Sequence, residues 1–104
     1  MKVLVFNHNN ALAEFAASEM IELIMKKPAA VICLASGDSP KLTCELFVKK
    51  AIAEKINVKD FTFIGLDEWI DLSPKTEGSC QNDFHKRIFG PLGILPSQYH
   101  LFDG

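Results

Sequence analysis

Apolar positions along the chain fall into short continuous runs, separated by longer stretches with helical spacing. The runs at residues 2–6, 29–35 and 61–66 predict three β-strands, and residues 99–102 predict the start of a fourth. The second run lacks any alternation of polar and apolar residues, which is typical of a parallel strand covered on both faces.

The first predicted helix covers residues 10–26, with Asn10 as its N-cap and Pro28 beyond its end. At about 100° per residue its alanines and long aliphatic side chains share one face, and its charged side chains share the other. Phe15 falls on the polar face, and the helical wheel does not explain it.

Two further helices are predicted between the strands. Ser39, followed by Pro40, is expected to cap a helix that runs to about residue 55. Ser79 is expected to cap a helix over residues 81–89, which Gly90 and Pro91 should break. The resulting β-α-β-α-β-α order predicts an α/β fold with a doubly wound parallel sheet and right-handed crossovers.

Composition narrows the function classes. The chain has 104 residues, of which 48% are hydrophobic and 23% charged, so one globular unit is expected over residues 1–104. The formal net charge of -2, without a basic run, argues against nucleic-acid binding. No apolar stretch approaches the roughly 20 residues that span a bilayer, and no signal peptide is indicated, so a cytoplasmic location is expected.

Neither the cysteines nor the histidines form a ligand pattern. The three cysteines lack CxxC or Cys/His spacing, so we expect reduced thiols and neither a disulfide framework nor a zinc site. The three histidines are scattered along the chain. The sequence therefore indicates no metal.

The first candidate site is the turn after the second predicted strand, which contains Ser36, Gly37, Asp38 and Ser39. A glycine turn that leads into a helix points free backbone N–H groups at one spot, which suits a phosphate or another anion. The carboxylate of Asp38 would repel such an anion unless it points away or pairs with a cation. An ordinary strand-to-helix turn is the alternative, and the turn alone leaves both interpretations open.

The second candidate site is the acidic pair Asp67 and Glu68 at the end of the third predicted strand, followed by Trp69. Ligands of open parallel sheets collect beyond the carboxyl ends of the strands, so the pair and the Ser36 turn should converge. Neighbouring side chains of a strand point in different directions, so one carboxylate is expected to face a ligand while the other anchors the loop. A solvated, salt-bridged loop is the alternative.

The two loops together, with Gly78-Ser79-Cys80 and Leu101-Phe102-Asp103-Gly104, resemble the N-terminal half of the glucosamine-6-phosphate deaminase family. Galactosamine-6-phosphate isomerases and 6-phosphogluconolactonases are relatives of that family. The resemblance covers essentially the whole chain. It implies a Rossmann-like α/β domain that acts on a sugar 6-phosphate, with no cofactor and with a small-molecule sugar phosphate as its partner, and it leaves open whether a homo-oligomer forms.

The resemblance also implies roles for particular residues. Asp67 matches the base and proton shuttle of an aldose-ketose isomerisation linked to loss of ammonia, and Glu68 matches a supporting neighbour. Ser36, Gly37 and Ser39 match the turn that holds the substrate phosphate, and Asp38 replaces the small residue usual there. The aromatic Trp69 favours an amino-sugar phosphate over a lactone.

Family members are more than twice as long, and their second half supplies an Asp-x-His pair, a glutamate and basic residues. The resemblance therefore implies that the activity belongs to a longer parent, and that these 104 residues alone lack full activity. A 6-phosphogluconolactonase is the alternative within enzymes. A non-catalytic sugar-phosphate binding module and an inactive fragment are the alternatives outside them.

Overall fold

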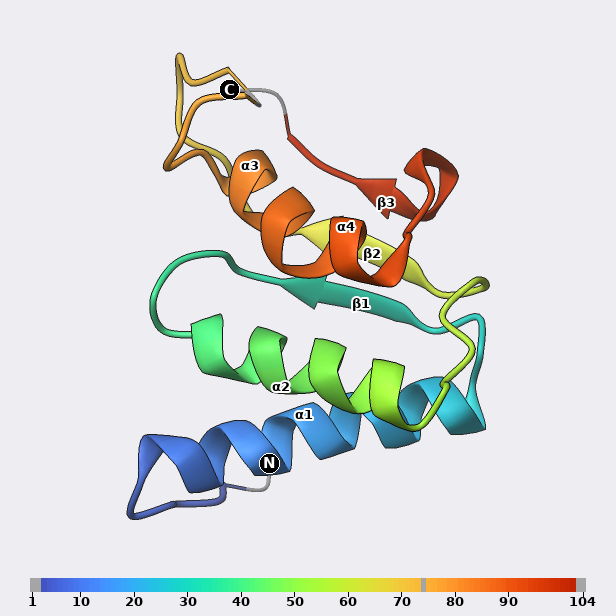
Figure 1. Cartoon of the computed structure of the whole chain (residues 1–104). Coiled ribbons are helices and arrows are strands. Elements are labelled where there is room, and N and C mark those ends of the chain that lie inside the picture. Colours follow the sequence, from blue (N-terminus) through green and yellow to red (C-terminus); the bar gives the residue numbers. More distant parts are fainter. Residues whose placement is uncertain (1–2, 74, 103–104) are drawn as a thin grey trace.

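The computed structural model describes residues 3–73 and 75–102, in which helices and strands alternate (Figure 1). The first three helices and the strands between them follow in the order α1 (Asn9–Lys26), β1 (Val31–Leu34), α2 (Lys41–Ala53), β2 (Thr62–Gly65) and α3 (Cys80–Phe84). The remaining elements are a π-helical turn η1 (His85–Phe89), α4 (Gly90–Leu92), a 3-10 turn η2 (Pro96–Gln98) and β3 (Tyr99–His100).

The three strands form one parallel sheet in the order β1-β2-β3. Ile32 lies beside Phe63 in the register of β1 and β2, and Phe63 lies beside Tyr99 in that of β2 and β3. α2 contacts both α1 and the helical segment that follows α3. The predicted α/β fold with a parallel sheet is thus confirmed.

The hydrophobic core lies on one face of this sheet. Ile32 and Phe63 point into it and are buried together with Phe47 of α2 and Phe84 of α3. Phe63 and Phe84 meet edge to face, with their ring centroids 4.9 Å apart.

The opposite face of β1 is open in the described residues. Val31 is 61% exposed and Cys33 is also exposed, because side chains alternate between the two faces of a strand. The expectation that both faces of this strand are covered is therefore wrong for the part of the protein that the structure describes.

The predicted first strand is also wrong where it can be checked. Residues 3–6 have no regular secondary structure, and Val3 and Val5 are 75% and 88% exposed; Lys2 lies outside the described residues. Phe6 packs instead against Phe15 of α1, with ring centroids 5.2 Å apart. This contact explains why Phe15 stands on the polar face of its helix.

The caps predicted for the first two helices differ from those observed. α1 begins at Asn9 with His8 as N-cap, two residues before the predicted cap Asn10, and ends at Lys26 as predicted. α2 has Pro40 rather than Ser39 in the N-cap position, without a side-chain hydrogen bond.

α2 ends at Ala53, two residues early, because Lys55 adopts a left-handed conformation with a φ of 53°. The N–H of Ile56 donates to the carbonyl of Ala51, and that of Lys55 donates to the carbonyl of Ile52. This pair of bonds is a Schellman motif, which closes the helix.

The third helix starts as predicted, since the Ser79 hydroxyl accepts a hydrogen bond from the Asn82 N–H at 3.0 Å. It is not broken at Gly90 and Pro91. Pro91 has no N–H and its ring crowds the preceding turn, and the chain accommodates it by widening that turn into the π-helical segment η1. Gly93, with a φ of 64°, ends the helix.

Gly65 sets how closely α3 approaches β2, so we predict that Gly65→Ala destabilises the fold. A Cβ at this position would lie 2.7 Å from Leu101 Cδ2 and 3.0 Å from Phe84 Cε2. Such overpacking should lower the free energy of unfolding by about 1–3 kcal/mol, measured by chemical denaturation. The second change Leu101→Ala should lose less stability in the Gly65→Ala background than alone; strict additivity would contradict the proposed contact.

Candidate functional site

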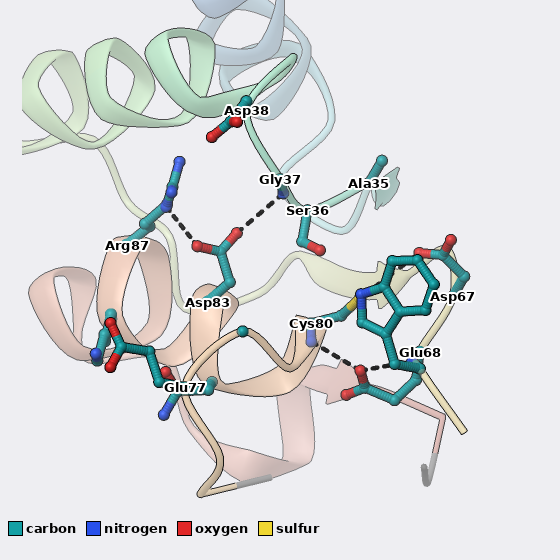
Figure 2. Close-up of a pocket in the computed structure, with 14 residues that line it drawn as sticks. Ala35, Ser36, Gly37, Asp38, Asp67, Glu68, Glu77, Cys80, Asp83 and Arg87 are labelled. Carbon is teal, nitrogen blue, oxygen red and sulfur yellow. Dashed lines mark hydrogen bonds and ion pairs between the residues drawn. The ribbon is translucent and has the colours of Figure 1, made fainter. Parts of the chain in front are cut away.

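The loops after β1 and β2 and the start of α3 enclose a cavity of about 710 Å³ (Figure 2). The cavity is lined by Ser36, Gly37 and Asp38 from the first loop and by Asp67 and Glu68 from the second. The predicted convergence of the two loops is therefore observed, because both follow the carboxyl ends of adjacent parallel strands. Ser39 is not among the lining residues.

Glu68 holds the second loop to the start of α3. Its Oε1 accepts from the backbone N–H groups of Cys80 at 2.7 Å and Trp69 at 2.9 Å, and its Oε2 accepts from that of Gln81 at 2.9 Å. The N–H groups of Cys80 and Gln81 lie at a helix start and have no partner within the helix, so the carboxylate satisfies them and also meets the positive end of the helix dipole. Glu68 therefore acts as an anchor.

The pKa of Glu68 reflects this arrangement. Partial burial raises it, but the N–H groups of Gln81, Cys80 and Trp69 together outweigh burial and hold the pKa below its ordinary value. Glu68 is thus ionised at neutral pH and engaged by backbone donors. These contacts suit a structural role better than proton transfer.

Asp67 is exposed to the cavity and has a different environment. Its Oδ1 lies 3.9 Å from the Sγ of Cys80, which donates to it (Figure 2). Burial raises the pKa of the Cys80 thiol; a hydrogen bond with Ser36 lowers it, and the charges of Glu68 and Asp67 raise it further. Cys80 therefore stays a neutral donor at neutral pH, between the two loops.

The Ser36 turn is tied to the third helix. Gly37 has a φ of 101°, which favours glycine, and its N–H donates to the Oδ2 of Asp83 at 3.2 Å. The other oxygen of Asp83 pairs with the Nε of Arg87 one helical turn later. The N–H that the sequence assigned to a phosphate is thus bonded to a carboxylate of the chain itself.

Sequence reasoning missed several residues of the cavity. Glu77, Cys80, Asp83, Lys86 and Arg87 line it alongside the two predicted loops. The available signal was the i,i+4 spacing of Asp83 and Arg87 on a predicted helix, which favours an ion pair. Nothing in the sequence indicated that this pair would reach the Ser36 turn.

The cavity is rich in carboxylates, with five from the described residues against two basic side chains, Lys86 and Arg87. Among the described residues, no three His, Cys, Asp or Glu side chains gather as a metal ion requires. Within the same part of the chain, no helix is both long and apolar enough to cross a membrane.

Comparison with known proteins supports the resemblance. AgaI of Escherichia coli (strain K12), a candidate deaminase, is 40% identical over 92 residues, which are 88% of this chain and 37% of AgaI. The glucosamine-6-phosphate deaminase of Rhodopirellula baltica is 34% identical over 101 residues, 97% of this chain and 40% of that enzyme. The resemblance to glucosamine-6-phosphate deaminases is confirmed. No protein-family model matches the chain.

Solved structures agree with these relatives. A monomeric glucosamine-6-phosphate deaminase of the NagB superfamily superposes with a TM-score of 0.91 at 28% identity, over 97% of this chain and 42% of that one. The 6-phosphogluconolactonase of Thermotoga maritima has a TM-score of 0.75 at 19% identity, over 98% and 44%, and shows the shared fold alone. The chain spans about two fifths of the length of the relatives it matches.

We predict that Glu68→Ala destabilises the protein in a pH-dependent way. Because the pKa of Glu68 is lowered on folding, its contribution is complete above the unfolded-state value of 4.5 and is lost as the pH falls through the folded-state value. Loss of this helix cap should lower the free energy of unfolding by about 1 kcal/mol at pH 7.

Denaturation of both proteins at pH 7 and pH 3 measures this effect. The difference from the wild type should shrink at the lower pH. The variant Glu77→Ala removes an exposed carboxylate of the same cavity and serves as the control. A difference that stays constant between the two pH values would contradict the anchoring role of the ionised Glu68.

Proposed function

We propose that the chain is the N-terminal part of an amino-sugar-6-phosphate deaminase or isomerase, and that residues 1–104 form one α/β unit of it. The proposed reaction converts glucosamine 6-phosphate or galactosamine 6-phosphate into a ketohexose 6-phosphate and ammonia. One observation carries the proposal: Asp67 and the Ser36 turn line the same cavity in a chain similar to glucosamine-6-phosphate deaminases.

Asp67 is the proposed general base. In the open-chain amino sugar, carbon 2 bears the amine. The proton on carbon 2 is acidic, because this carbon adjoins the carbonyl carbon. The carboxylate takes that proton, and the carbonyl oxygen gains one, which gives an enolamine. The carboxylate then returns its proton to carbon 1, and the nitrogen loses one to water, which leaves an imine at carbon 2. Water then hydrolyses the imine, which releases ammonia and leaves the ketose. These steps require positioned acids and bases rather than a redox cofactor.

The charges of the cavity support an amino-sugar phosphate as the substrate. This molecule carries an ammonium group near the reacting carbon and a phosphate at the opposite end. The cavity has the exposed carboxylate of Asp67 in one part and the basic side chain of Arg87 in another, and Lys86 also lines it. Such a distribution complements both charges of the substrate.

The proposed roles differ between the predicted residues. Glu68, whose oxygens accept three backbone N–H groups, holds the loop that carries Asp67. Ser36 lines the cavity and is the proposed hydroxyl contact of the turn to the phosphate. Asp38 lines it too, so phosphate binding requires its carboxylate to face away from the anion. Ser39 has no proposed role, because it does not line the cavity.

We predict that Asp67→Asn abolishes most of the ammonia release by the intact protein. An amide cannot take the proton, so the rate should fall by about 100-fold or more. A coupled assay for ammonia with glucosamine 6-phosphate and galactosamine 6-phosphate measures it. Asp71→Asn, which changes an exposed aspartate outside the cavity, is the control. Full activity in the Asp67 variant would remove this residue from the mechanism.

The two alternatives predict different results in the same assays. A 6-phosphogluconolactonase would hydrolyse its lactone without releasing ammonia from amino sugars, and only the shared fold supports that reaction. A non-catalytic binding module would bind glucosamine 6-phosphate in calorimetry and turn over neither substrate. We expect ammonia release without lactone hydrolysis.

A further inference from the structure

Arg87 and Asp83 form a second charged group beside the Ser36 turn. Asp83 uses one oxygen to accept the Gly37 N–H and the other to pair with the Arg87 Nε. Figure 2 shows the carboxylate of Asp83 between these two donors. The guanidinium is therefore fixed through Nε, and its two terminal nitrogens are left for other partners.

One of these terminal nitrogens lacks a partner. The Nη1 of Arg87 is buried and has no hydrogen-bond acceptor among the residues that the structure describes. A buried donor without an acceptor costs about 1–3 kcal/mol, so such a group calls for an explanation. The side chain as a whole keeps 22% of its surface exposed and lines the cavity, so a ligand there can contact the exposed part of Arg87.

The charges of the side chains that line the cavity also favour Arg87 as a partner for an anionic ligand. Of its five carboxylates, that of Glu68 is engaged by backbone N–H groups and that of Asp83 by Gly37 and Arg87. Arg87 and its neighbour Lys86 are the only basic side chains among the described residues that line the cavity. An anionic group that enters the cavity would therefore have these two cations to pair with, and Arg87 would share its charge between that group and Asp83.

Arg87 and Asp83 lie apart from the proposed base, Asp67. Figure 2 shows Arg87 and Asp83 on one side of Ser36, and Asp67 on the other. A ligand that spans the cavity can thus place an anionic end near Arg87 and a carbon near Asp67. The two sides of the cavity therefore differ in chemistry, with a cation on one side and the proposed base on the other.

We propose that Arg87 binds the anionic end of the ligand, a phosphate monoester, and that Asp83 is the positioning residue that orients its guanidinium. The planar fork of a guanidinium matches two phosphate oxygens, and a phosphate bound in the cavity would give the exposed part of the Arg87 guanidinium an acceptor besides Asp83. The inference deepens the proposed function and rests on it for the identity of the phosphate ester as a sugar phosphate.

Nuclear magnetic resonance can test this directly, because Arg87 is the only arginine in the sequence. Its Nε–H gives a single arginine side-chain signal in a ¹⁵N correlation spectrum of the full chain. Titration with inorganic phosphate should shift this signal and that of the Gly37 amide together, whereas chloride at equal ionic strength should not. A Nε–H signal that is unchanged by phosphate overturns the proposal, and this wild-type measurement does not depend on whether any variant folds.

Variants then separate the contact from a general charge effect. Arg87→Met should weaken phosphate binding by at least about tenfold, as expected for a lost charged hydrogen bond, and Arg87→Lys should weaken it less. Lys59→Met removes an exposed charge outside the cavity and should stay within about twofold of the wild type. Equal losses in Arg87→Met and Lys59→Met would overturn the proposal.

The role of Asp83 has its own readout. In Asp83→Asn the Nε–H signal of Arg87 should move and broaden in the absence of phosphate, because its charged acceptor is lost. An unchanged signal overturns the positioning role.

The outcome is distinguishable from failure of the proposed function. Phosphate binding that depends on Arg87 in a protein without ammonia release would support this subsite and contradict the enzyme. Ammonia release that depends on Asp67, together with phosphate binding that Arg87→Met leaves unchanged, would support the enzyme and contradict the Arg87 subsite.

Discussion

The carboxylate of Glu68 is the interaction on which the site depends. It accepts three backbone N–H groups and so joins the end of β2 to the start of α3. Asp67 precedes it in the chain, and Cys80 and Asp83 lie in the helix that it caps. The second loop is therefore joined to the third helix at this one helix end. The same engagement leaves Asp67, rather than Glu68, free to meet a ligand.

Much of the fold could be predicted because its signals are local. The apolar run that contains β2, the helical spacing of α1 and the capping serine Ser79 each depend on a few neighbouring residues. Predictions failed where distant partners decide. Residues 3–6 have the composition of a strand, yet in the described part of the chain they have no neighbouring strand, and Phe6 turns to Phe15. The exposed face of β1 likewise depends on what packs against it, which the run of apolar residues does not encode.

The residues of the candidate site also fall into those that the sequence could predict and those that it could not. Asp67, Glu68 and the Ser36 turn were predictable, because parallel strands bring their carboxyl ends to one edge of the sheet. The contact between Asp83 and Gly37 could not be predicted, since 46 positions separate them in sequence and no local signal joins them. Ser39 differs from the rest of the turn, because it directly precedes Pro40, the N-cap of α2, and is not among the residues that line the cavity.

The order of the strands in the sheet is the order in which they occur in the chain. Among the described residues, each strand therefore pairs with its neighbours in sequence, which keeps loop closures short and permits folding in the direction of synthesis. All the residues that line the cavity lie between Ala35 and Arg87. The pocket can thus assemble on the nascent chain before β3 emerges, and the later stacking of Tyr99 on Phe89 involves two residues that do not line it.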